Sequence, residues 1–203
     1  MSETKPPLPY GKQRLEPPAG APFWVFGYGS LIWRPGFAHD AVVPGLLRGY
    51  HRRFCVYSHR YRGTPEDPGL VLGLAPGGAC RGLVYRVPPG EGEAVMDYLH
   101  EREMVTGVYN PRWLTVDTAE GRVMAAGFVV DVHHPQYAGR LRDADMAAII
   151  RHAQGSGGPN LDYLRNTVHH LDALDMHDHA LHRLLRHVEA TGGAPTDSAP
   201  GDS

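Results

Sequence analysis

A tight loop with two glycines is the first feature of this chain that could do chemistry. It reads Gly27-Tyr28-Gly29-Ser30-Leu31. Alternate glycines let the backbone turn sharply and let a ligand reach main-chain N–H groups that a β-carbon would screen. Such a loop can bind an anion or an oxyanion, although an ordinary turn at the end of a strand is an equally good interpretation. It lacks the third glycine of a dinucleotide fingerprint and the Gly-Lys-Ser/Thr of a phosphate loop, so neither nucleotide-binding motif is satisfied.

The serine of this loop raises the question of a nucleophile. Ser30 is not followed two residues later by the glycine of the hydrolase elbow, and no His and Asp partners can be assigned to it from spacing. We therefore interpret its hydroxyl as a hydrogen-bonding group for a substrate.

A single carboxylate interrupts an otherwise apolar helix face. The segment 90–103 has good helix formers after Gly92, and residues four apart on a helix stack on one face. Val95, Leu99 and Glu103 form one such row, which places a carboxylate where apolar groups face the core. Either Glu103 sits at a helix end and pairs with a nearby arginine, or it lines a cavity where desolvation raises its pKa and makes it a better base. The neighbouring acidic row, which we expect to be solvated, is Glu93, Asp97 and Glu101.

The elements that must position these residues can be read from the pattern of apolar residues. Runs rich in aromatic and β-branched residues predict strands; they cover 23–26, 42–49, 52–58, 70–74, 80–87, 112–117 and 122–132. After the helix at 90–103, helical patterns follow at 143–154, 160–174 and 178–190, with Asp143 and Asn160 as N-caps. Strands first and helices last indicate an α+β domain.

Composition bounds the domain and its partners. Residues 1–22 predict a Pro-rich N-terminal arm, 23–189 a single domain, and 190–203 a disordered C-terminal tail. The net charge of −2 gives no field that would attract nucleic acid or an anionic membrane. No apolar stretch approaches the ~20 residues of a membrane helix, and no signal peptide is evident, so we expect a cytoplasmic protein. Cys55 and Cys80 are expected to be reduced, buried thiols. The sequence leaves the oligomeric state open.

Histidines near the end of the chain invite a metal hypothesis. The cluster contains His169, His170, His177, His179, His182 and His187. In a helix, His179 and His182 lie at i, i+3 and could share a metal ion, with a third ligand from Asp175, Asp178 or another segment. Because many of these histidines alternate with leucines, we favour the solvated face of an amphipathic helix and assign no metal site.

Several blocks together resemble a known family. They are Phe23-Trp24-Val25-Phe26-Gly27-Tyr28-Gly29-Ser30-Leu31-Ile32-Trp33, Gly49-Tyr50-His51-Arg52-Arg53-Phe54-Cys55, Arg62-Gly63-Thr64-Pro65, Pro68-Gly69-Leu70-Val71, Gly82-Leu83-Val84-Tyr85-Arg86-Val87, Tyr98-Leu99-His100-Glu101-Arg102-Glu103 and Gly157-Gly158-Pro159-Asn160-Leu161-Asp162-Tyr163-Leu164. In this order they are similar to the ChaC family of γ-glutamylcyclotransferases.

The resemblance implies a fold, an activity and site residues. The implied fold is a compact mixed β-barrel flanked by helices, and the implied activity cleaves glutathione to 5-oxoproline and cysteinylglycine. The family's substrate-binding loop falls on Gly27, Tyr28, Gly29, Ser30, Leu31 and Ile32, and its catalytic glutamate falls on Glu103. An acidic helper earlier on the same helix is also implied, but the matching region here reads Glu93-Ala94, which leaves that role without a clear equivalent.

An anionic substrate would need cationic or hydrogen-bonding groups in its pocket. Tyr109 and Tyr163 could bind a carboxylate of the substrate or could simply bond within the core. A local cationic cluster comprises Arg48, Arg52, Arg53, Arg60 and Arg62, and we interpret most of it as solvated arginines on a strand.

The implied reaction closes a lactam ring inside the substrate, with Glu103 as general base and then general acid. Loop N–H groups would stabilise the oxyanion, and the scheme requires no metal or organic cofactor. Two alternatives stay open: another γ-glutamyl amine or amino acid as substrate, and a non-catalytic regulatory protein linked to cation transport.

Overall fold

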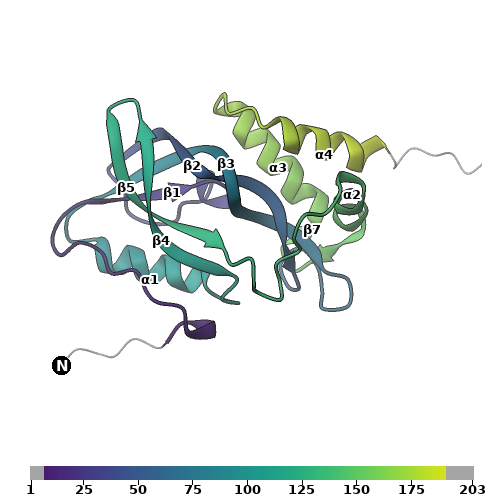
Figure 1. The fold of residues 1–203 in the computed structure, drawn as a ribbon, viewed down its shortest axis with the longest axis horizontal. Helices are drawn as coiled ribbons and strands as arrows, with labels where there is room; N and C mark the ends of the chain where they lie inside the picture. Colours follow the sequence, from purple (N-terminus) through teal and green to yellow (C-terminus); the bar gives the residue numbers. More distant parts are fainter. Residues whose placement is uncertain (1–6, 191–203) are drawn as a thin grey trace, which may run out of the picture.

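The computed structural model describes residues 7–190, and a closed five-stranded β-barrel lies at its centre (Figure 1). Its strands are β1 (Phe23–Gly27), β2 (Ala41–Ser58), β3 (Gly69–Val87), β4 (Tyr109–Thr118) and β5 (Gly121–Val130), in the order β1-β3-β2-β4-β5. These neighbours pair antiparallel, whereas β5 closes the barrel by pairing in parallel with β1 and β3. The barrel is therefore mixed, as the family resemblance implies.

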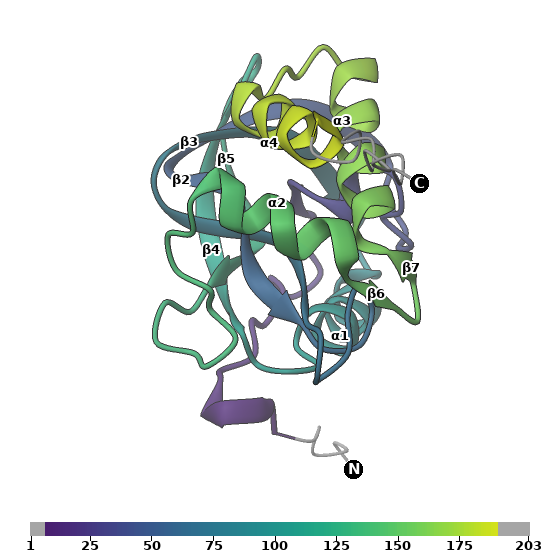
Figure 2. The ribbon, with the colours of Figure 1, turned by 90° about the vertical axis from the view of Figure 1, so that its right-hand side faces the viewer.

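Helices flank the barrel on two sides, which confirms the predicted α+β class. Helix α1 (Gly92–Glu103) connects β3 to β4 on one side. Helices α2 (Asp143–His152), α3 (Asn160–Ala173) and α4 (His179–Ala190) gather on the other, where α2 and α3 contact β3 (Figures 1 and 2). The short elements are η1 (Pro9–Gly11), η2 (Ser30–Ile32), β6 (Gln154–Gly155) and β7 (Gly158–Pro159). Within residues 7–190, no helix is long and apolar enough to cross a membrane.

Two pairs of predicted strands are each one continuous strand. The predicted strands 42–49 and 52–58 join into β2, and 70–74 and 80–87 join into β3. Gly49 adopts a φ of 84°, and the pairing register shifts between Arg48 and Tyr50. A glycine bulge of this kind bends a strand without ending it, which explains why the glycine signal did not mark a loop here.

The predicted N-caps of α2 and α3 are wrong. Asn160 is fully buried, and its side-chain amide bonds both the N–H and the carbonyl of Leu70, each at 2.7 Å. It therefore acts as a hydrogen-bonding partner for β3, and Pro159 occupies the N-cap position. Asp143 is the first residue of α2 rather than its cap. Sequence spacing gave no sign that the Asn160 amide was needed by a distant strand.

The core confirms the apolar pattern of α1. Val95 and Leu99 are buried on α1, as the row ending at Glu103 predicts. Cys55 and Cys80 are buried free thiols. The largest fully buried side chains of the barrel include Phe26, Phe54, Leu74, Tyr85 and Phe128.

The described part of the N-terminal segment, residues 7–22, contacts the barrel. Leu8 belongs to the core, and the Lys12 amine hydrogen-bonds Asn110 at 2.7 Å and forms an ion pair with Asp131. At the other terminus α4 continues to Ala190, and the rest of the predicted tail lies outside the described residues.

Candidate active site

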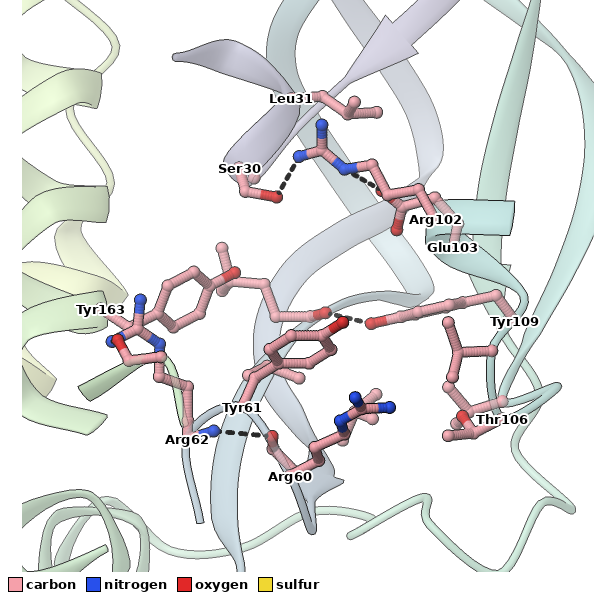
Figure 3. A pocket seen from close by; sticks show the side chains of 18 of the residues that line it. Ser30, Leu31, Arg60, Tyr61, Arg62, Arg102, Glu103, Thr106, Tyr109 and Tyr163 are labelled. Atoms are coloured by element: carbon pink, nitrogen blue, oxygen red, sulfur yellow. Dashed lines mark hydrogen bonds and ion pairs between the residues drawn. The ribbon is translucent and has the colours of Figure 1, made fainter. Parts of the chain in front are cut away.

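A cavity of about 1160 Å³ lies between η2, the C-terminal end of α1, the start of β4 and the loop from β2 to β3 (Figure 3). The predicted site residues that line it are Tyr28, Gly29, Ser30, Leu31, Glu103, Tyr109 and Tyr163. They come from four separate stretches of chain, so the barrel and its helices assemble the cavity rather than any local motif.

Gly27 and Ile32, which the family resemblance also implies, lie behind the loop and do not line the cavity. Gly27 ends β1, and a β-carbon there would lie 3.1 Å from the ring of Tyr85. The Tyr85 hydroxyl donates to the carbonyls of Leu31 at 2.9 Å and Ile32 at 3.1 Å. These contacts hold the back of the loop in place.

Gly29 is the glycine of the loop that faces the cavity. A β-carbon on it would lie 3.3 Å from Leu72 Cδ1 and 3.6 Å from the Tyr163 hydroxyl. The following residues form the single turn η2, in which the Ile32 N–H donates to the Gly29 carbonyl at 2.8 Å. The absence of a side chain on Gly29 therefore lets the turn lie close to Tyr163. It also leaves the first N–H groups of the turn unscreened by a β-carbon.

Glu103 is the last residue of α1, and its carboxylate lies at the cavity wall with 18% of the side chain exposed (Figure 3). Arg102 Nε lies 3.2 Å from Glu103 Oε1. Burial raises the pKa of Glu103 above its ordinary value of 4.5, and the nearby Arg102 opposes this only in part. Both explanations offered by the sequence therefore hold at once: the residue ends a helix beside an arginine, and it lines a cavity.

Arg102 connects the end of α1 to the glycine loop and was missed by sequence reasoning. Its guanidinium donates to Ser30 Oγ at 2.9 Å, to the Arg34 carbonyl at 2.6 Å and to the Tyr98 hydroxyl at 2.8 Å. The partners Ser30 and Arg34 lie about 70 residues away in sequence, so no local pattern could find them. An arginine cannot deprotonate a hydroxyl, so this contact gives Ser30 a hydrogen-bonding role and no nucleophilic one.

Three tyrosine hydroxyls lie close to Glu103. The Tyr109 hydroxyl accepts a hydrogen bond from Tyr28 and donates to the Leu72 carbonyl at 2.8 Å. Tyr163 bonds the backbone of the same Leu72. Burial, followed by the negative charge of Glu103, raises the pKa of Tyr163 to about 12. For Tyr28 and Tyr109 burial is again the largest cause, and their pKa values are raised well above the ordinary value of 10.0. All three phenols therefore stay protonated and can donate hydrogen bonds.

Arginines lie at the opposite end of the cavity from Glu103, on the loop between β2 and β3 (Figure 3). Arg62 donates to the carbonyls of Gly157 at 2.5 Å and Pro159 at 3.2 Å, and its guanidinium lies 5.3 Å from the ring centroid of Tyr163. Burial lowers the pKa of Arg62, but an arginine remains charged at neutral pH. Arg60 lines the same end. The carboxylate of Glu103, paired with Arg102, and the two loop arginines therefore lie at opposite ends of the cavity.

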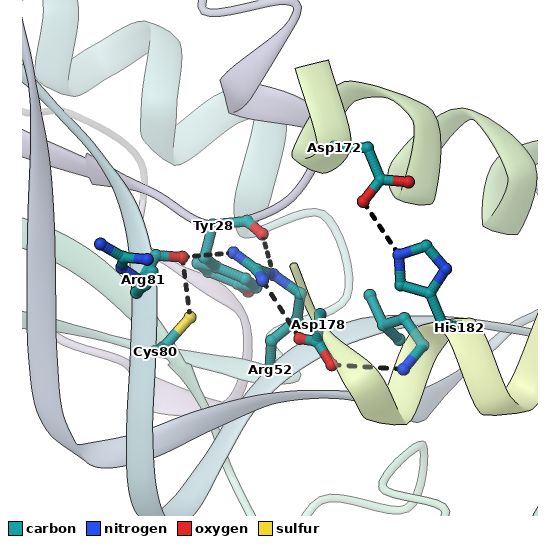
Figure 4. A network of polar contacts seen from close by, with 8 residues as sticks. Tyr28, Arg52, Cys80, Arg81, Asp172, Asp178 and His182 are labelled. Carbon is teal, nitrogen blue, oxygen red and sulfur yellow. Dashed lines mark hydrogen bonds and ion pairs between the residues drawn. The ribbon is translucent and has the colours of Figure 1, made fainter. Parts of the chain in front are cut away.

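Arg52 is an exception to the interpretation of most of the arginine cluster as solvated. It is 6% exposed, and its guanidinium donates to the Tyr28 carbonyl at 2.5 Å and the Arg81 carbonyl at 2.6 Å (Figure 4). A third nitrogen lies 3.2 Å from Asp178 Oδ2. Arg52 therefore ties the glycine loop to β3 and to the residue that precedes α4. Arg48, by contrast, is exposed and pairs with Asp117, as expected.

Comparison with known proteins identifies the family. The sequence profile described as ChaC-like protein matches residues 23–191. The chain belongs to the ChaC-like family. Among its relatives, this ChaC-like chain is 39% identical over 173 residues to the glutathione-specific gamma-glutamylcyclotransferase of Escherichia coli strain K12, covering 85% of this chain and 75% of the relative. It is 34% identical over 177 residues to gamma-glutamylcyclotransferase 2-3 of Arabidopsis thaliana, covering 81% of this chain and 89% of the relative.

A solved structure confirms the fold of this ChaC-like chain. The crystal structure of a glutathione-specific gamma-glutamyl cyclotransferase from yeast superposes with a TM-score of 0.76 at 24% identity. The superposition covers 84% of this chain and 96% of the yeast chain. The barrel and its flanking helices are therefore the fold of that protein.

Proposed function

We propose that this ChaC-like protein is a γ-glutamylcyclotransferase that cleaves glutathione to 5-oxoproline and cysteinylglycine, with Glu103 as its acid–base residue. The observation that carries the proposal is a carboxylate of raised pKa at the wall of a large cavity, facing the loop from Tyr28 to Leu31. The names of the relatives support the same reaction and substrate.

The reaction is internal to the γ-glutamyl group. Its α-amino nitrogen attacks the γ-carbonyl carbon, a five-membered lactam closes, and the amide C–N bond breaks to release the amine of cysteinylglycine. The two reacting groups are already tethered, so the enzyme needs to add little proximity. It must instead supply a free amine, because the α-amino group is mostly protonated at neutral pH.

Glu103 meets that need. As a carboxylate it accepts the proton of the attacking amine, and as a carboxylic acid it returns that proton to the leaving nitrogen. The pKa of Glu103 is raised by burial, which brings the group closer to the pH at which proton transfer in both directions is efficient. Arg102 Nε, 3.2 Å from Oε1, holds the carboxylate in one orientation and limits the rise of its pKa.

The developing oxyanion requires donors that are already in place. We assign this role to main-chain N–H groups of the turn that begins after Gly29 and to the phenol of Tyr163. The hydrogen bond between the Tyr163 hydroxyl and the Leu72 backbone opposes part of the rise in the pKa of Tyr163. This is the effect expected when the hydroxyl oxygen accepts the Leu72 N–H. Its own O–H proton can then donate to a substrate oxygen. In contrast, the Tyr28 hydroxyl donates to Tyr109, and the Tyr109 hydroxyl donates to the Leu72 carbonyl.

The arginines at the end of the cavity opposite Glu103 set the orientation of the substrate. With the γ-glutamyl group beside Glu103, the glycine carboxylate of glutathione extends toward Arg60 and Arg62 at the other end. A guanidinium pairs well with a carboxylate, so these arginines favour a tripeptide with a free C-terminus. A panel of γ-glutamyl amines and amino acids would show this as a lower kcat/KM for substrates that lack the terminal carboxylate.

Replacement of Glu103 tests the proposal. We expect Glu103→Gln to lower kcat for glutathione by about 10²–10⁴-fold, the usual contribution of a general acid–base group. Glu120→Gln makes the same chemical change at an exposed turn between β4 and β5 and should leave turnover unchanged. If Glu103→Gln kept wild-type turnover, the role would pass to Glu101, the other carboxylate that lines the cavity.

A further inference from the structure

A group of side chains of the kinds that ligate metals lies at the junction of α3 and α4. Figure 4 shows two of its members, Asp172 and His182. Asp172 stands in the last turn of α3, His177 in the connection, and His182 in α4. None of the three lines the cavity. The reaction scheme of the proposed function uses none of them, so they call for a separate explanation.

The three donor atoms converge on one point. His177 Nδ1 and His182 Nε2 each lie 2.9 Å from the same oxygen, Oδ1 of Asp172. All three ligand atoms lie within 4.8 Å of one another. A tetrahedral zinc ion with metal–ligand distances of about 2.0–2.1 Å needs its donors about 3.3 Å apart. The two spacings of 2.9 Å are therefore about 0.4 Å shorter than such an ion requires, and the third is no more than 4.8 Å, so small side-chain shifts would admit the ion.

We propose that Asp172, His177 and His182 form a binding site for a divalent transition-metal ion of the Zn²⁺ class. Two imidazoles and one carboxylate are a donor set that suits zinc and its neighbours and suits Mg²⁺ or Ca²⁺ poorly. The side chains are 34%, 60% and 31% exposed. Water therefore has access to complete the coordination, and the ion can enter directly from solvent.

A second carboxylate lies near the other ring nitrogen of His177. His177 Nε2, the ring nitrogen that faces away from Asp172, lies 3.8 Å from Asp175 Oδ1. Metal-binding histidines commonly direct their other N–H toward a carboxylate, which fixes the tautomer and makes the ligating nitrogen more basic. The competing interpretation is that protonated imidazoles pair with Asp172, and metal titration separates the two.

The cluster differs from the pair that helical spacing suggests. His179 and His182 lie at i, i+3 on α4, but His179 is exposed and is not part of the group. The ligands that join His182 come instead from the end of α3 and from the connection. His179 is therefore a matched control, since it is a histidine of the same helix outside the site.

The position of the site gives a bound ion a structural consequence. Asp178, between His177 and His182 in sequence, accepts the Leu181 N–H at 3.2 Å at the start of α4 and pairs with Arg52. Arg52 in turn donates to the Tyr28 carbonyl (Figure 4). An ion that fixes both histidines would hold the turn that carries Asp178. Because the ion would bind the folded chain and not the unfolded chain, it would also raise the melting temperature of the protein.

Calorimetric titration of the chelator-treated chain with ZnCl₂ tests the proposal. We expect one saturable site that binds Zn²⁺ and no heat with MgCl₂. Asp172→Asn, His177→Gln and His182→Gln should each weaken binding at least 10-fold, while His179→Gln should bind as the wild type does. If His182→Gln and His179→Gln gave the same isotherm, the proposal would be overturned.

A measurement on the unmodified chain guards against variants that fail to fold. Crystals of the wild-type protein soaked in ZnCl₂ should show an anomalous peak about 2.0–2.1 Å from His177 Nδ1 and His182 Nε2. A peak only at other histidines, or none, would contradict the assignment. Because neither experiment measures turnover, the outcome is independent of the proposed catalytic function.

Discussion

At the scale of single residues, Glu103 lies where two electrostatic effects oppose each other. Burial disfavours its charged form, and Arg102 Nε at 3.2 Å favours it. Burial is the larger effect, so the pKa is raised. A raised pKa makes a carboxylate a better base. The same shift means that the ionised side chain lowers the free energy of unfolding at neutral pH.

The raised pKa of Glu103 predicts a pH-dependent difference in stability between Glu103→Gln and the wild type. Between the ordinary pKa of 4.5 and the raised value, the folded chain binds more protons than the unfolded chain. The free energy of unfolding therefore falls as the pH rises through that window, and the loss persists above it. Glu103→Gln, which cannot ionise, should melt at a higher temperature than the wild type at pH 7 and lose that advantage near pH 4. Thermal melts at both pH values check this, and a less stable variant at pH 7 would contradict it.

The same ionisation predicts the acid limb of the rate profile. Because the proposed mechanism needs Glu103 deprotonated to accept the proton of the amine, kcat/KM for glutathione should fall on the acid side with a midpoint above 4.5. Rates measured between pH 4 and 8 give that midpoint. A midpoint at or below 4.5 would mean that the base is a solvated carboxylate.

Tyr163 is the tyrosine whose hydroxyl we expect to donate a hydrogen bond to the substrate. Tyr163→Phe removes that donor and leaves the ring, so kcat/KM for glutathione should fall about 10-fold, the worth of one neutral hydrogen bond of roughly 1.4 kcal/mol. Tyr137→Phe, at a tyrosine outside the cavity, is the control. Equal kinetics for the two variants would remove Tyr163 from the site.

At the scale of elements, the bulge in β2 decides which side chains of that strand are buried. Before the bulge, Gly45 and Leu47 are the buried positions, whereas after it Arg52 and Phe54 are. The register shift between Arg48 and Tyr50 thus reverses the alternation. Without it, Arg52 would face outward.

Loss of the Arg52 side chain should therefore affect both stability and catalysis. Removing one member of a buried pair costs ~3–5 kcal/mol. Asp178 keeps 20% of its side chain exposed, so for Arg52→Met we expect the free energy of unfolding to fall by about 2–3 kcal/mol. Release of the Tyr28 carbonyl should also lower kcat/KM on the order of 10-fold or more. Urea unfolding and glutathione kinetics measure the two effects.

The exposed Arg48 supplies the matched comparison. Arg48→Met breaks only a surface pair with Asp117, so its free energy of unfolding should change by no more than ~0.5 kcal/mol. If Arg52→Met were as mild as Arg48→Met, Arg52 would not be a support of the loop.

At the scale of the whole molecule, local patterns predicted the elements and long-range contacts determined the site. The apolar row of α1 was enough to set Glu103 apart from Glu101, and apolar runs located the barrel strands, although β2 and β3 were each predicted as two strands. The inward turn of Arg52 depends on a bulge, and the contact of Arg102 with Ser30 joins residues 72 positions apart. Neither leaves a periodic signal in the sequence, so only the closed barrel reveals them.

The products formed from glutathione test the central claim most directly. Internal attack by the α-amino group gives 5-oxoproline and cysteinylglycine in equal amounts, whereas attack by water on the same carbonyl would give glutamate. Quantifying all three after incubation with the wild-type chain and with Glu103→Gln separates these outcomes. We predict equimolar 5-oxoproline and cysteinylglycine from the wild type and a loss of about 10²–10⁴-fold in the variant. Release of glutamate in place of 5-oxoproline, or no product at all, would contradict the account.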